Sequence, residues 1–309
     1  MKKLLISGLL IFAMMMIVGC TNSSEDDFSG TINIYTRDTS SGTRDGFMKG
    51  IGFGDAATDD SLLASGFTTT NNAGIMDAMR TDLRGIGYVS LASVNDTIKA
   101  LNFEGVAPSL ETVLDDTYEL KRPFNYMLRA DDDFENDTMK ELAYAFIAFL
   151  QSQEGADVIN DAGAIAVGGD YRWEDVVDEH PVCALDNSGE TLRFGGSDSI
   201  TAVAVALSED FAPRCGNVVT ENNHTGSSDG YKRTQGEEKD GVNAVEIGYA
   251  SRPFRGEEID NTDESTRGQL AWDAIVAIVH VDNPIDGLTA EQLTKIYSGE
   301  ITDWEELLD

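Results

Sequence analysis

Basic residues are scarce in this 309-residue sequence, which has 22 Lys and Arg against 55 Asp and Glu and a formal net charge of −33 at pH 7. This balance makes nucleic acid and anionic membrane surfaces poor partners, and it predicts a well-hydrated, highly soluble surface. It does not exclude an anion receptor, because a buried site responds to local dipoles and a nearby arginine more than to screened surface charge. At this length the chain can form two lobes, each with its own core.

Cysteine and histidine are also rare, with three residues of each type. They show no paired spacing typical of a zinc site, so we expect no metal and no cofactor. Cys20 lies near the start of the chain, whereas Cys183 and Cys215 lie in different segments. In an exported protein these two could form a disulfide, or they could remain separate thiols.

The first 20 residues have the pattern of a targeting segment. Two lysines follow the first methionine, residues 4–18 are mostly apolar, and Gly19 and Cys20 end the stretch. The sequence Ile17-Val18-Gly19-Cys20 resembles a bacterial lipobox, in which Cys20 becomes the lipidated first residue once a signal peptide of residues 1–20 is cut. Ordinary cleavage and a retained membrane anchor are the alternatives. Residues 21–30 are polar and acidic, and we expect them to form a flexible tether.

A strand, a turn of small residues and a helix are predicted shortly after this tether. Residues 31–34 alternate in polarity as a strand does, and a helical spacing of apolar residues begins at Phe47. Between them, Ser40 or Ser41 can cap the helix, and Gly42 lets the backbone approach a ligand closely. The free N–H groups of the first helical turn and the helix dipole would face an anion. The same pattern also fits a capped helix without a ligand.

The spacing Arg-x-x-x-Ser-Gly-Thr in this turn resembles the anion-binding loop of PstS-type phosphate-binding proteins, the solute receptors of bacterial phosphate ABC transporters. On that resemblance Arg37, Ser41, Gly42 and Thr43 match the loop that contacts phosphate. The guanidinium of Arg37 would supply a planar, two-pronged donor. Arg44, one residue beyond the motif, is expected to be solvated on the following helix.

Other stretches of the sequence match further segments of the same family. The most specific is the IYSGEITDW sequence within residues 284–304. Weaker matches are a strand with close-packed glycines at 85–91, the first phosphate loop at 192–199, the second glycine–serine loop at 224–232 and a strand end at 245–252.

These segments occur in a rotated order. Residues 31–168 resemble the usual second half of the family, and residues 191–309 resemble the usual first half. Residues 168–190 are polar and irregular and are expected to form a linker that joins the old end to the old beginning. We interpret this as a circular permutation, which proteins tolerate where their termini lie close together at the surface. A fragment of a tandem array is the alternative.

The resemblance implies an α/β fold of the periplasmic-binding-protein type (type II), with two lobes around a central cleft and two crossover strands as a hinge. On the rotated order, lobe A would comprise residues 121–273, and lobe B would combine residues 31–120 with 274–309. The loops of both lobes would converge on the cleft and replace the water shell of an anion with N–H and hydroxyl donors. Closure of the lobes would trap the ligand.

The function implied by the resemblance is capture of inorganic phosphate outside the cell membrane and its delivery to an ABC permease by a lipid-anchored monomer without enzymatic activity. Charge would come from Arg37, and hydroxyls from both lobes would complete the site. The residues expected to contact phosphate are Arg37, Ser41, Gly42, Thr43, Ser197, Asp198, Ser199, Ser227, Ser251 and Arg252.

Arg252 departs from the common family pattern, which has an aspartate at this position. Another carboxylate must then accept the proton of phosphate if sulfate is to be rejected. Asp198 is the preferred candidate because it lies between Ser197 and Ser199, and Asp229 is the second candidate. Capping of the next helix is the other role that fits Asp198.

Three other functions compete with phosphate transport. The first is a receptor for another tetrahedral oxyanion such as sulfate. The second is a phosphatase or phosphotransferase, which needs a nucleophile with a base or metals. His224 is the one histidine near the expected site, and nothing in the sequence pairs it with a nucleophile. The third is a phosphate-sensing surface protein without a transport role.

Overall fold

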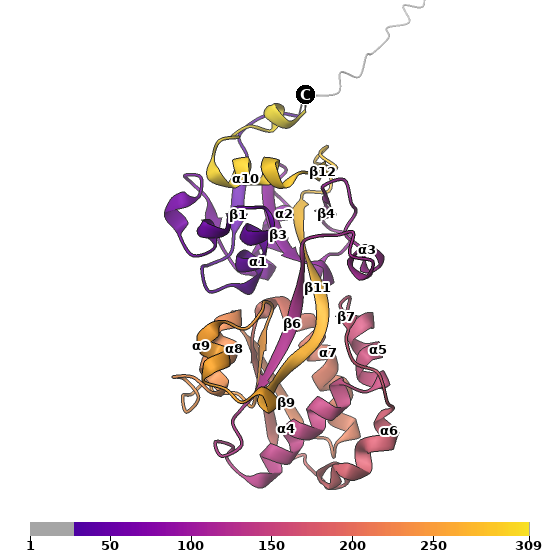
Figure 1. Cartoon of the computed structure of the whole chain (residues 1–309). Coiled ribbons are helices and arrows are strands. Elements are labelled where there is room, and N and C mark those ends of the chain that lie inside the picture. The colour runs from indigo at the N-terminus through magenta and orange to yellow at the C-terminus, as the bar shows by residue number, and fades with distance from the viewer. Residues whose placement is uncertain (1–27, 309) are drawn as a thin grey trace, which may run out of the picture.

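The computed structural model describes residues 28–308 as two α/β lobes, one above the other in Figure 1, joined by two long strands. The expected two-lobed architecture is thereby confirmed. The expected signal peptide, which includes Cys20, and residues 21–27 of the expected tether lie outside the described residues. Within the described part of the chain, no helix is both long and apolar enough to cross a membrane.

The helices lie on the outer faces of both lobes. Their bounds are α1 Gly42–Gly50, α2 Asn72–Met79, α3 Leu110–Leu114, α4 Asp137–Leu150, α5 Gln153–Asp161, α6 Trp173–Val176, α7 Thr201–Phe211, α8 Ser227–Thr234, α9 Gly256–Asp260 and α10 Ala290–Ser298.

The strands form one ten-stranded sheet that runs through both lobes and one separate pair, β5 with β12. Along the sheet the order is β2-β1-β3-β11-β6-β10-β8-β9, and β4 and β7 also pair with β11. Their bounds are β1 Asn33–Thr36, β2 Thr68–Thr69, β3 Gly85–Ser90, β4 Lys99–Ala100, β5 Asn102–Phe103, β6 Lys121–Leu128, β7 Ile165–Ala166, β8 Thr191–Gly196, β9 Val219–His224, β10 Ile247–Ala250, β11 Arg267–Val279 and β12 Gly287–Leu288.

Strand β11 belongs to both lobes. Its first part, residues 267–274, pairs antiparallel with β6, and its last part, residues 275–279, pairs antiparallel with β3. In Figure 1 the two long strands β6 and β11 pass side by side between the lobes. Arg122 and Asp273 lie directly opposite each other in this ladder.

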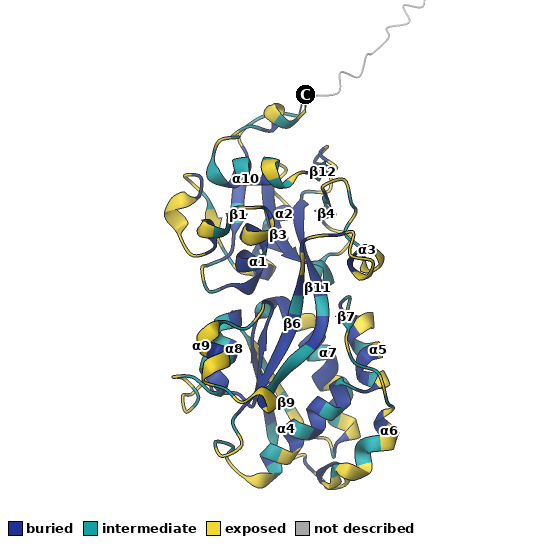
Figure 2. Cartoon of the chain, in the orientation of Figure 1, coloured by how far each residue is buried: buried dark blue, intermediate teal, exposed yellow. Residues whose placement is uncertain are grey.

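Each lobe has its own hydrophobic core, as the dark interiors of both lobes in Figure 2 show. The upper core is built from residues between 32 and 120 and between 274 and 304, with Ile165 added. The lower core is built from residues between 124 and 271. We therefore keep the names lobe B for the upper unit and lobe A for the lower unit.

Helix caps follow the sequence signals. The side chain of Ser41 accepts a hydrogen bond from the N–H of Arg44 (3.4 Å) and caps α1. Asn136 caps α4 in the same way, through the N–H of Met139 (2.9 Å). These bonds satisfy N–H groups that have no partner inside the helix.

The segment 168–190 differs from the expected surface linker. It contains the short helix α6, and both Trp173 and Val182 are buried in the core of lobe A. In the same segment Cys183 forms a disulfide with Cys215, across a sequence separation of 32 residues. Apolar anchors and a covalent bond therefore fix this connection to lobe A.

The two ends of the described chain lie against each other on lobe B. The N–H of Ile32 donates to the carbonyl of Thr302 (2.8 Å), and the N–H of Trp304 donates to the carbonyl of Gly30 (3.1 Å). Phe28 packs against the ring of Trp304, with 5.6 Å between centroids. Residues 28–30, expected to be part of a free tether, are thus attached to lobe B.

The disulfide should contribute substantially to the stability of lobe A. Closing a loop of this length lowers the entropy of the unfolded chain by an amount worth roughly 3–4 kcal/mol in the chain-entropy account. Substituting Cys183→Ala and Cys215→Ala together should lower the unfolding free energy by about that amount in urea titrations of the protein from residue 21 onward. Unfolding midpoints equal to those of the oxidised wild type would contradict this expectation.

The adjacent ends make the permuted order testable. Linking residue 308 to residue 28 with a few Gly and Ser residues, and opening the chain between the exposed Ser188 and Gly189, should restore the order usual for the family. We expect this variant to fold with the circular-dichroism spectrum of the wild type. An opening placed inside β11 is the control, and it should abolish folding because that strand serves both lobes.

Candidate functional site

Strand ends from both lobes meet in the cleft. Arg37 follows β1 in lobe B, whereas Ser197 and Ser251 follow β8 and β10 in lobe A. β8 runs parallel to β10 and β9, so the carboxyl ends of these strands lie at one edge of the sheet. That edge is where open α/β sheets bind ligands.

Five buried hydroxyls gather at these strand ends, and we call them the hydroxyl cluster: Thr43, Ser197, Ser199, Ser227 and Ser251. The Oγ1 of Thr43 bonds to the Oγ of Ser199 (2.5 Å) across the cleft. Within lobe A the Oγ of Ser251 is 2.8 Å from the Oγ of Ser197 and 3.1 Å from the Oγ of Ser227. Since a hydroxyl both donates and accepts, these groups can bond to one another or turn their donors toward an anion.

Gly42 allows α1 of lobe B to approach the serines of lobe A. A Cβ at this position would lie 2.3 Å from the Oγ of Ser227 and 2.8 Å from the Oγ of Ser251. No side chain fits there without displacing the cluster. The N-termini of α1 and α8 therefore meet in the cleft, and both present free N–H groups to it.

Arg37 and Asp198 form an ion pair between the lobes. The Nη2 of Arg37, which is fully buried, lies 2.5 and 2.6 Å from the two carboxylate oxygens of Asp198. The same carboxylate accepts the backbone N–H of Asn72 at the start of α2 (3.2 Å). Asp198 thus accepts hydrogen bonds from two groups of lobe B, the guanidinium of Arg37 and the N–H of Asn72. The carboxylate of Asp229 instead accepts the hydroxyl of Thr225, which belongs to lobe A.

One donor of Arg37 has no partner. Its Nη1 donates to the Oγ1 of Thr43 (3.3 Å), but its Nε is buried without a hydrogen bond to any described residue. A charged donor is rarely left buried and unpaired in a folded protein. The backbone of Arg37 is held by Tyr88, whose hydroxyl accepts the N–H of Arg37 (3.3 Å) and whose pKa is raised by burial.

A second arginine, Arg122, enters the same cluster and was not predicted from the sequence. Its Nη1 donates to the Oγ1 of Thr43 (2.8 Å) and to the Oγ of Ser251 (3.2 Å). Its Nε and Nη2 both donate to one carboxylate oxygen of Asp273 (3.0 and 2.9 Å). Burial raises the pKa of the Asp273 carboxyl, and the guanidinium of Arg122 opposes that shift. The sequence did contain one indication of this pair, because Arg122 and Asp273 are charged residues within mostly apolar strands.

Three residues discussed in the sequence analysis make contacts that differ from the expected ones. Arg252 donates through both prongs to Glu258 (2.7 and 2.8 Å) and makes no described bond to the hydroxyl cluster. Ser41 uses its side chain as the helix cap. Arg44 is fully buried rather than solvated, because its guanidinium donates to the carbonyls of Arg37 and Ala56 and so supports the loop that carries Arg37.

His224 and Asp198 line the same cavity, and among the described residues the side-chain partner of His224 is Asn222 rather than a serine, threonine or cysteine. The Nε2 of His224 is 3.0 Å from the Oδ1 of Asn222, and its ring lies 5.9 Å from that of Tyr249. Burial lowers the pKa of His224 to about 4, so the ring is neutral at physiological pH. The described residues thus give no support to a phosphatase built on this histidine.

Two cavities flank the cluster, and each is lined by residues of both lobes. One, of about 420 Å³, includes Asn72 and Ser93 of lobe B with Asp198 and His224 of lobe A. The other, of about 410 Å³, includes Ser40 of lobe B. Both cavities therefore lie between the two lobes.

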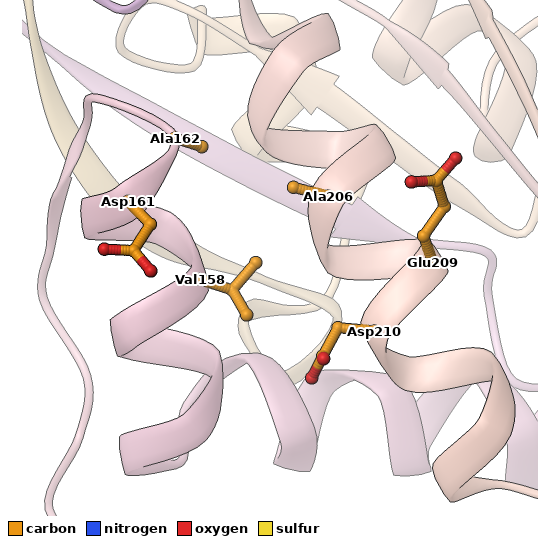
Figure 3. A pocket seen from close by; sticks show the side chains of 6 residues that line it. All are labelled: Val158, Asp161, Ala162, Ala206, Glu209 and Asp210. Atoms are coloured by element: carbon orange, nitrogen blue, oxygen red, sulfur yellow. The ribbon is translucent and has the colours of Figure 1, made fainter.

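A further groove of about 480 Å³ lies between α5 and α7 on lobe A (Figure 3). Its side chains are apolar or acidic, as at Val158, Asp161 and Glu209. With no side-chain donor in its lining, this groove does not suit an anion.

Comparison with known proteins agrees with this architecture. The family described as PBP superfamily domain matches residues 184–309. Two curated relatives named "Phosphate-binding protein PstS 2" align over nearly the whole chain. The protein of Streptococcus pneumoniae is 28% identical over 313 residues, covering 99% of both chains. The protein of Streptococcus agalactiae is 29% identical over 318 residues, covering 99% of this chain and 97% of its own.

A solved structure is similar to this chain in fold as well as in sequence. It is described as a phosphate ABC transporter, phosphate-binding protein from Streptococcus pneumoniae, and it aligns with a TM-score of 0.62 and 27% identity. The alignment covers 90% of this chain and 99% of that one. The resemblance expected from the sequence is therefore confirmed: residues 184–309 match the PBP superfamily domain, and the chain is similar over nearly its whole length to the PstS-type phosphate-binding proteins.

Proposed function

We propose that the protein binds inorganic phosphate between its lobes, outside the cell membrane, and delivers it to an ABC-type permease. The observation that carries this proposal is the convergence of two buried guanidinium groups with five buried hydroxyls, in which the Nε of Arg37 has no partner. An oxyanion would supply the missing acceptor, and the hydroxyls would turn toward it. The names of the full-length relatives support the same ligand.

In this proposal Arg37 supplies charge from lobe B, and the hydroxyl cluster supplies donors from both lobes. The N–H groups at the start of α1 and α8 add further donors at a favourable dipole end. Asp198 is the acceptor for the proton that phosphate carries near neutral pH. The Nε of Arg252 is also buried without a described partner, but its two Nη atoms bond to Glu258 and none of its described bonds reaches the hydroxyl cluster. Arg252 is therefore assigned to the fold of lobe A rather than to the ligand.

Ligand binding would then favour the closed arrangement of the lobes. The contacts of Arg37 with Asp198 and of Thr43 with Ser199 cross the cleft, so they form only when the lobes approach. A ligand that bonds to both lobes adds to these contacts and shifts the population toward closure.

We also propose that the protein is a lipid-anchored monomer that delivers phosphate to a permease, and each of these three points has its own support. The lipobox-like sequence at Cys20 supports attachment by lipid, and residues 21–27 would separate that anchor from lobe B. The full-length match to a protein described as part of a phosphate ABC transporter supports delivery to a permease. Each lobe buries a core of its own within one chain, which supports a monomer.

Arg37→Ala should weaken phosphate binding by at least about tenfold. Removing one partner of a buried, charge-assisted contact costs roughly 2–5 kcal/mol, and about 1.4 kcal/mol corresponds to a tenfold change. Isothermal titration calorimetry on the protein from residue 21 onward measures the effect. Arg80→Ala, at a half-exposed position after α2, is the control and should change the affinity little. Equal losses of phosphate affinity in both variants would indicate that the overall charge of the protein, and not a specific site at Arg37, determines binding.

Asp198→Asn should narrow the preference for phosphate over sulfate. Sulfate carries no proton, so a carboxylate in the site faces it with an unpaired acceptor, and such mismatches can change affinity by up to roughly 10⁴–10⁵. An amide offers a donor in place of one acceptor. Competition binding with both anions tests this. Asp229→Asn, in the first turn of α8, is the matched control, and unchanged discrimination in Asp198→Asn would exclude Asp198 as the selective group.

A further inference from the structure

The ion pair of Arg122 with Asp273 lies at the point where the chain crosses between lobes. The two residues face each other on β6 and β11, and both are almost fully buried, at 3% and 2% exposure. The Nη2 of Arg122 lies 2.9 Å from the Oδ2 of Asp273. Their strands, β6 and β11, are the two that pass between the lobes in Figure 1. A buried ion pair by itself is weak evidence of a stabilising role, because an apolar pair of similar size is often as stable.

The guanidinium of Arg122 divides its donors between two tasks. Nε and Nη2 are held by Asp273, whose other carboxylate oxygen accepts the hydroxyl of Ser90 (2.8 Å). This fixes the plane of the guanidinium and leaves Nη1 directed at the hydroxyl cluster. There Nη1 reaches Thr43 of lobe B and Ser251 of lobe A at the same time.

We propose that Arg122 is a second cationic ligand of the oxyanion, carried by the hinge strand, with Asp273 as the residue that positions it. The inference deepens the proposed function and rests on it. An oxyanion that bonds to the hydroxyls of Thr43 and Ser251 comes within reach of Nη1, since that atom already bonds to both. Arg37 then binds the ligand from lobe B, and Arg122 binds it from the crossover.

The charges around the cluster favour this arrangement. Arg37, Arg122, Asp198 and Asp273 sum to zero, so the site is neutral before an anion enters, inside a protein of net charge −33. Asp273 lies behind the guanidinium of Arg122 as seen from the cluster. The attraction between Nη1 and a bound anion therefore acts over a shorter distance than the repulsion from Asp273, and Coulomb energy falls with distance.

Arg122 also links the ligand to lobe closure. Its two hydroxyl partners belong to different lobes, and its backbone belongs to the strand that joins them. An anion that bonds to Nη1 and to the hydroxyls of Thr43 and Ser251 keeps these two residues, and therefore the two lobes, close to the guanidinium of Arg122. Loss of this donor should therefore lower both the affinity and the stabilisation that the ligand gives to the closed protein.

Calorimetric titration with inorganic phosphate tests the proposal. Because Arg122→Gln alone would leave Asp273 buried without a cationic partner, the main variant is Arg122→Gln with Asp273→Asn, which removes both charges. We expect a folded protein with a Kd at least about 30-fold higher than that of the wild type. Arg122→Lys keeps the charge, but one ammonium cannot replace the three nitrogen atoms, so its Kd should rise at least about fivefold.

The matched control lies directly after the same strand. Arg129 follows β6, is a buried arginine of lobe A and pairs with Asp240 (3.1 Å) outside the hydroxyl cluster. Arg129→Gln with Asp240→Asn should leave the Kd within about threefold of the wild type. The rise in Tm on adding phosphate is the second readout, and it should shrink in the Arg122 variants and persist in the control.

The outcomes separate this inference from the proposed function. A wild type that binds phosphate, together with an Arg122→Lys or double variant whose Kd stays within about threefold, overturns the role of Arg122 and leaves the proposed function intact. A wild type that shows neither heat of binding nor a rise in Tm with phosphate overturns the proposed function and this inference with it.

Discussion

Every buried guanidinium of the cleft must be balanced by a carboxylate, and much of the architecture follows from this constraint. An unpaired buried charge costs several kcal/mol, so each pair fixes two chain segments relative to each other. Arg37 with Asp198 joins the lobes, Arg122 with Asp273 joins the two crossing strands, and Arg252 with Glu258 stays within lobe A. The first two also direct spare donors at the hydroxyl cluster, so the interactions that hold the lobes in register are those that suit an anion.

Sequence patterns revealed the parts of the site that local structure creates. The strand, the small-residue turn and the helix that carry Gly42 and Thr43 can be predicted from local spacing, and similar turns carry Ser197, Ser227 and Ser251. Arg122 and Asp273 escaped detection because their meaning depends on strand pairing between segments about 150 positions apart in the chain. The burial of Arg44 was missed for the same reason, since its acceptors lie in loops that no spacing rule places beside it.

Segment order was suggested by the sequence together with the two-lobed architecture. Because the alignments with the two PstS 2 relatives cover almost all of each chain, those proteins share the order found here. The structure offers a physical reason why such an order is tolerated. The hydrogen bonds between residues 30–32 and 302–304 bring the ends of the described chain together, so the same lobes could be traced from a different starting point with little loss of contacts.

The position of both ends of the described chain on lobe B has a mechanical consequence. Any attachment made through the N-terminal segment restrains lobe B, while lobe A is joined to lobe B by the two crossing strands and by contacts across the cleft. Lobe B then acts as the stationary part and lobe A as the moving arm. Opening and closing would swing one face of the protein relative to whatever surface holds it, and a receptor waiting on that surface would distinguish the two states by the position of lobe A.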